Sequence, residues 1–103
     1  YEEAIEACKT AISLDPECGT AHNDLAAYLI EKGELDEAIL HLQRALCARR
    51  YEAHHDSRYH LGRVYMRKGM LKRAIVELRK AIEIAPGHRP AQAMIARIER
   101  MLN

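Results

Sequence analysis

Apolar side chains recur at steps of three and four residues along almost the whole chain. Ala4, Cys8 and Ile12 follow this spacing near the start, and Ala38 and Leu42 follow it one block later. Residues at such steps share one face of a helix, and no segment shows the two-residue alternation of a half-buried strand. The pattern therefore predicts six helices, over residues 2–14, 20–32, 35–50, 56–68, 71–84 and 90–102.

Glycine and proline mark where several of these helices end. Gly33 and Gly69 each follow a lysine, which is typical of a left-handed residue after a helix C-terminus. Asp15-Pro16 and Ala85-Pro86 end two other helices, because the residue before a proline is disfavoured in the helical conformation.

The chain also repeats itself. Residues 1–5, 35–39 and 71–75 are three versions of one block, and their alanines are separated by 34 and then 36 residues. A period near 34 residues indicates stacked helix pairs, each packed on its neighbours, rather than one closed core.

In their spacing these helix pairs resemble the tetratricopeptide repeat (TPR) family, whose pattern is W-x2-L-G-x2-Y followed by A-x3-F and P. The resemblance implies an all-α, right-handed superhelix of antiparallel helix hairpins that binds other proteins and is not an enzyme. Smaller or more polar residues replace the Trp and Phe of the pattern. The matching residues are His22-x2-Leu25-Ala26-x2-Leu29 with Ala38-x3-Leu42, Arg58-x2-Leu61-Gly62-x2-Tyr65 with Ala74-x3-Leu78 and Pro86, and Ala4-x3-Cys8 with Pro16.

From this pattern we expect a single domain. It comprises the second helix of a truncated repeat (1–18), two repeats (19–54 and 55–88) and a capping helix (89–103). Because the chain opens inside a repeat, the face carrying Ile5, Cys8 and Ile12 would lack its covering helix. We therefore expect a piece of a longer array that forms a homodimer or self-assembles through this end.

The middle repeat departs from the pattern at its end. Arg50 stands where the pattern has proline. We expect the preceding helix to run on past Arg50, with residues 51–55, including His54 and His55, forming a longer corner.

Composition limits the compartment and the partners. The longest apolar run, residues 25–30, is far shorter than the roughly 20 residues that cross a bilayer. No signal-peptide pattern opens the chain and the three cysteines are an odd number, so we expect a cytoplasmic protein with no membrane partner. Residues 1–38 hold ten acids and two bases, whereas residues 39–103 hold fourteen bases and five acids.

The family resemblance places the first helix of each pair on the concave side. A residue two positions from the buried stripe is rotated by roughly 200° and faces the groove. Arginine suits carboxylates, so we expect an acidic partner segment in the groove, although Arg63 and Arg67 are equally typical of a solvated helix face. The expected groove residues are Asn23, Ala27, Ile30 and Glu31, then Tyr59, Arg63, Met66 and Arg67, and finally Arg97 and Arg100.

Two other partners are less well supported. Some TPR proteins hold the C-terminal carboxylate of heat-shock chaperones in a Lys/Asn clamp, but the corresponding positions here carry Asn23, Ala27, Asp56 and His60. The clamp does not transfer, so we do not expect chaperone binding. Nucleic acid would be attracted by the basic second half, but Tyr59 alone offers a stacking platform.

The sequence offers no cofactor, metal or catalytic site. The six histidines and three cysteines lack the paired spacing of metal ligands. No Gly-rich phosphate loop or Gly-x-Ser-x-Gly elbow is present, and Cys18, just before a helix, is the single candidate for a reactive thiol. A non-catalytic interaction scaffold is therefore the predicted function, with self-assembly of the array as the alternative and nucleic-acid binding third.

Overall fold

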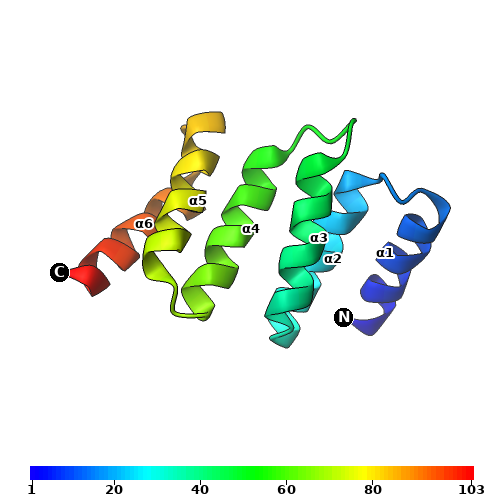
Figure 1. The fold of residues 1–103 in the computed structure, drawn as a ribbon, viewed down its shortest axis with the longest axis horizontal. Helices are drawn as coiled ribbons and strands as arrows, with labels where there is room; N and C mark the ends of the chain where they lie inside the picture. Colours follow the sequence, from blue (N-terminus) through cyan, green and yellow to red (C-terminus); the bar gives the residue numbers. More distant parts are fainter. The chain divides into compact units, whose positions relative to one another are not determined.

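The structure, a computed structural model, describes residues 1–103 and contains six helices and no strand (Figure 1). This arrangement of consecutive helix pairs confirms the predicted all-α fold of TPR type. The helices are α1 (Glu2–Leu14), α2 (Gly19–Lys32), α3 (Leu35–Cys47), α4 (His54–Arg67), α5 (Leu71–Ile84) and α6 (Arg89–Leu102).

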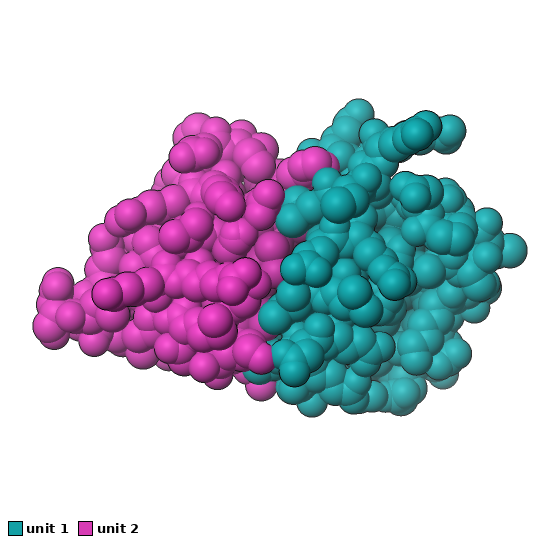
Figure 2. Space-filling model, viewed as in Figure 1, with its two compact units in different colours: residues 1–53 teal, residues 54–103 magenta.

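The chain divides into two compact units, residues 1–53 and residues 54–103, which Figure 2 colours separately. In unit 1, α2 packs against both α1 and α3. In unit 2, α5 packs against both α4 and α6, and α4 also touches α6.

The two sharp turns within helix pairs depend on glycine. Gly33 and Gly69 have φ angles of 81° and 79°, a left-handed conformation that strains other residues. After α2, the Gly33 and Glu34 N–H groups donate to the carbonyls of Ile30 and Leu29, which satisfies the end of the helix. The prediction of a left-handed glycine after each of these two helices is therefore confirmed.

Small residues set how closely the paired helices approach. Ala26, Ala38 and Ala45 in unit 1 are fully buried. In unit 2, a Cβ atom at Gly62 would lie 2.5 Å from Leu78 Cγ, so this contact between α4 and α5 requires glycine.

The corner after α3 differs from the prediction. Helix α3 ends at Cys47 instead of running past Arg50, and Ala48 is extended with ψ of 134°. Tyr51 is buried against Gly19, where an added Cβ would lie 2.5 Å from Tyr51 Cβ. With Tyr51 packed in this way the chain is extended after α3, and a new helix, α4, begins at His54. His54 and His55 therefore belong to α4 and not to the corner.

Candidate functional site

The predicted groove residues of unit 2 lie along one side of α4. Tyr59, Arg63, Met66 and Arg67 follow one another at steps of four, three and one residues; the first three are half-buried and Arg67 is exposed. The other two predicted groove residues of unit 2, Arg97 and Arg100, are exposed on α6, a helix that contacts α4. No base of this set is fully buried.

Arg63 is held in place by neighbours on the same helix. Its Nη1 atom donates to His60 Nδ1 at 3.2 Å, so in a neutral imidazole the hydrogen is on Nε2. That Nε2 atom lies 3.4 Å from Asp56 Oδ2. Asp56, His60 and Arg63 therefore form a polar row along α4 that orients the Arg63 guanidinium.

The predicted groove residues of unit 1 are less open than expected. Ala27 is half-buried and Glu31 is exposed, but Asn23 and Ile30 are buried. The prediction of an open stripe is wrong for these two residues, because α2 packs against helices on two sides and buries eight of its fourteen residues.

The predicted self-association face also needs correction. Ile5 is only 3% exposed, so it belongs to the core and not to an open surface. Cys8 and Ile12 are half-buried, and burial raises the pKa of the Cys8 thiol, with the charge of Asp24 and then Cys18 adding to the effect. A raised pKa leaves less reactive thiolate at neutral pH.

Two histidines in unit 1 form a hydrogen-bonded, stacked pair that the sequence did not indicate. His22 Nε2 lies 2.9 Å from the carbonyl oxygen of Pro16, which can only accept, so this nitrogen carries the hydrogen. His22 Nδ1 then accepts from His41 Nδ1 at 2.9 Å. Burial lowers the pKa of His41, and the charges of His22, Arg44 and Lys9 lower it further.

An ion pair joins α4 and α5 in unit 2. Arg58 stands where the TPR pattern has Trp, and its Nη1 donates to Glu77 Oε1 at 2.8 Å. Glu77 is only 7% exposed, and Lys80 Nζ lies 3.7 Å from its other carboxylate oxygen. The pair is a structural feature, because losing Arg58 would leave the buried Glu77 carboxylate with only the more distant charge of Lys80.

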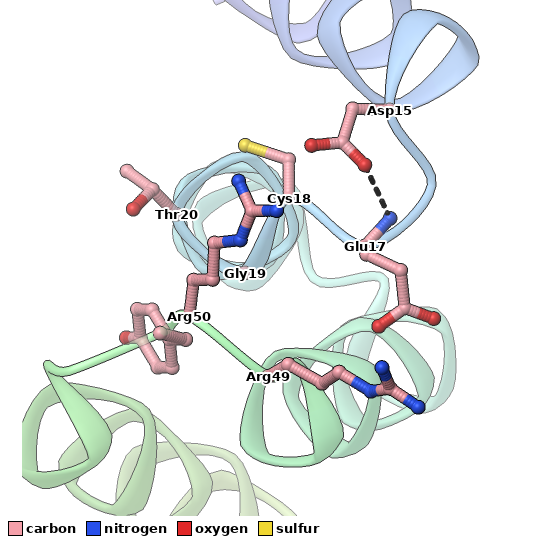
Figure 3. A pocket seen from close by; sticks show the side chains of 8 residues that line it. Asp15, Glu17, Cys18, Gly19, Thr20, Arg49 and Arg50 are labelled. Atoms are coloured by element: carbon pink, nitrogen blue, oxygen red, sulfur yellow. Dashed lines mark hydrogen bonds between the residues drawn. The ribbon is translucent and has the colours of Figure 1, made fainter.

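A hollow of about 510 Å³ lies at the start of α2 in unit 1 (Figure 3). Figure 3 shows the Arg50 side chain reaching between Cys18 and Thr20, while Arg49 extends on the side of Glu17. Carboxylates and guanidinium groups line the same hollow, so its charge favours neither anions nor cations. The sequence did not indicate this hollow, since it depends on the corner after α3.

The chain forms neither a metal-binding cluster nor a helix suited to span a membrane. No three His, Cys, Asp or Glu side chains are close enough together to hold a metal ion. None of the six helices has the length and apolar character that a membrane span requires.

The chain matches one family model and resembles solved structures of the same fold. A family model described as tetratricopeptide repeat matches residues 1–50 and 29–98, and no curated protein sequence matches the chain. The Arabidopsis OM64 TPR domain aligns with a TM-score of 0.90 and 18% identity over 97% of this chain and 81% of that domain.

Two further neighbours were solved with peptides. The first TPR of Spaghetti (RPAP3), bound to the HSP90 peptide SRMEEVD, has a TM-score of 0.89 and 18% identity over 99% of this chain and 79% of that one. The second TPR domain of human RPAP3, in complex with the HSP70 peptide SGPTIEEVD, has a TM-score of 0.84 and 19% identity over 96% of this chain and 81% of that one. At these identities the likeness shows the shared fold.

Proposed function

The chain belongs to the tetratricopeptide repeat family of non-catalytic protein-interaction modules, and we propose that it binds an acidic partner segment along the basic face of α4 and α6. The main support is the row formed by Tyr59, Arg63, Met66 and Arg67 on α4. Unit 2 as a whole carries eleven bases against four acids. This excess steers an acidic segment to the unit, and arginine binds its carboxylates in planar geometry.

The structural neighbours support an acidic partner but not an identical one. Two of them were solved with peptides that end in EEVD, whereas the positions of the carboxylate clamp carry other residues here. Asn23 is buried, and Asp56 and His60 lie beside one another on α4. We therefore expect acidic side chains, and not a free C-terminal carboxylate, to be the recognised feature.

A peptide panel tests this function. The probe is a capped, fluorescein-labelled nonapeptide rich in glutamate, with a glutamine counterpart as control. Arg67→Glu alone and Arg63→Glu with Arg67→Glu should weaken binding of the glutamate peptide about tenfold or more, as measured by anisotropy. The matched control is Lys72→Glu with Arg79→Glu on α5, which changes the net charge equally. Similar losses in both pairs would refute the assignment to α4.

The C-terminal carboxylate is tested with the peptide SRMEEVD as free acid and as amide. We expect the two forms to bind equally within a factor of about two. A tenfold preference for the free acid would instead support a chaperone-type clamp.

Self-assembly through α1 is a weaker candidate. The buried Ile5 side chain is unavailable for it, which leaves the half-buried Cys8 and Ile12. Analytical ultracentrifugation at high protein concentration distinguishes the two functions. Self-assembly predicts a dimer or larger species, whereas peptide binding along α4 does not require one.

A further inference from the structure

Three rings meet in unit 2 where α4 begins and α6 begins. His55 and Tyr59 are one turn apart on α4, and His88 is the N-cap residue of α6. The His88 ring centroid lies 5.7 Å from that of His55 and 5.0 Å from that of Tyr59. All three side chains are half-buried. We call His55, Tyr59 and His88 the ring cluster.

The polar atoms of the ring cluster are available to a ligand. The Ala91 N–H donates to His88 Nδ1 at 3.2 Å, so in the neutral ring the hydrogen of His88 is on Nε2. No residue of the chain bonds His88 Nε2, the Tyr59 hydroxyl or either nitrogen of His55. His22 differs, because both of its ring nitrogens are hydrogen-bonded within the protein.

The surroundings of the ring cluster favour an acceptor of negative charge. Asp56, the nearest acid in sequence, lies against His60. Arg89 follows His88 directly and is exposed, and Arg63 is one turn after Tyr59 on the same helix. Two N–H or O–H donors beside positive charge suit the two oxygens of a carboxylate.

We propose that the ring cluster is a recognition site for one carboxylate side chain of the bound segment, with the Tyr59 hydroxyl and His88 Nε2–H as donors. This inference rests on the proposed function and adds a site at the corner end of α4. Tyr59 was predicted from the sequence as a groove residue, but the contributions of His55 and His88 depend on how α6 begins.

Two variants test the ring cluster without removing structure. His88→Asn keeps a side-chain acceptor at the N-cap, where asparagine is among the best residues, and deletes the ring and its Nε2–H. Tyr59→Phe keeps the ring and deletes the hydroxyl. The matched control is Tyr28→Phe on α2, another half-buried tyrosine in a ring pair. Thermal unfolding of each variant checks that the fold is retained.

The readout is binding of the capped glutamate nonapeptide and of its glutamine counterpart. We expect Tyr59→Phe and His88→Asn each to weaken the glutamate peptide about tenfold, as for one hydrogen bond to a charged group, with no loss in Tyr28→Phe. In the wild type, saturation with the glutamate peptide should also shift the ¹⁵N resonance of His88 Nε2.

Three results would overturn the proposal, and they separate it from the proposed function. Loss of binding in Arg67→Glu with none in Tyr59→Phe and His88→Asn would reject the ring cluster and leave the function standing. Equal losses for the glutamate and glutamine peptides would show that the rings contact the backbone or an amide instead of a carboxylate. Absence of binding by the wild type would reject both.

Discussion

Breaking the Arg58–Glu77 ion pair should cost more than breaking any exposed pair of unit 2. Arg58→Leu removes the guanidinium 2.8 Å from a carboxylate that is 7% exposed. Removing one partner of a buried pair costs about 3–5 kcal/mol. Because the Arg58 side chain is 29% exposed and Lys80 stays 3.7 Å from Glu77, we expect a smaller loss, about 2–3 kcal/mol.

The assay is urea and thermal unfolding followed by circular dichroism. A loss of this size lowers the melting temperature by roughly 10–20 °C in a domain of about 100 residues. Arg79→Leu is the matched control, because Arg79 is 3.7 Å from Glu99 and both side chains are more than half exposed. That variant should lose less than about 1 kcal/mol.

The double variant decides whether the cost comes from an unpaired charge. Arg58→Leu with Glu77→Leu removes both charges and fills the space with apolar atoms, so it should recover to within about 1 kcal/mol of the wild type. Two outcomes would refute this reasoning: Arg58→Leu lowers the free energy of unfolding no more than Arg79→Leu, or the double variant is less stable than Arg58→Leu alone. Either one would show that the loss does not come from leaving the buried Glu77 charge unpaired.

Two further predictions concern unit 1. The pKa of His41 is lowered in the folded state, so the unfolded state binds more protons and stability should fall as the pH drops below about 6.5. Urea midpoints measured from about pH 8 to pH 5 should fall less steeply in His41→Gln than in the wild type, and equal pH dependence in both proteins would contradict the role of His41. Gly19→Ala places a Cβ 2.5 Å from Tyr51 Cβ and should lower the free energy of unfolding by about 1–3 kcal/mol. Gly87→Ala, whose Cβ would meet nothing within 4 Å, should leave stability nearly unchanged, and equal effects of the two variants would contradict the close contact between Gly19 and Tyr51.

Most of the fold could be predicted from the sequence because helix periodicity and helix ends are local properties. The bounds of α1 and α5 match the predicted ranges, and Gly33 and Gly69 have the expected left-handed conformation. The end of α3 could not be predicted, since it depends on Tyr51 packing against a residue 32 positions earlier in the chain, Gly19.

The candidate site was predictable only where one helix face decides exposure. The row on α4 follows from spacing alone. Asn23 and Ile30 were wrongly predicted to be exposed, because α2 packs against helices on two sides. The sequence pattern identified only one buried face of this helix. The partners of His41 and His88 come from other helices, and no local signal identifies them.

His88 holds its ring by the same bond that starts a helix. Since Nδ1 is already occupied by the Ala91 N–H, the imidazole is fixed in orientation before any partner arrives. A ring that is already immobilised in the free protein loses little rotational entropy when a ligand binds. Mobile surface side chains lose more, and this loss weakens their binding. The beginning of α6 would thus give unit 2 a ready-made, rigid contact at no added expense of ordering.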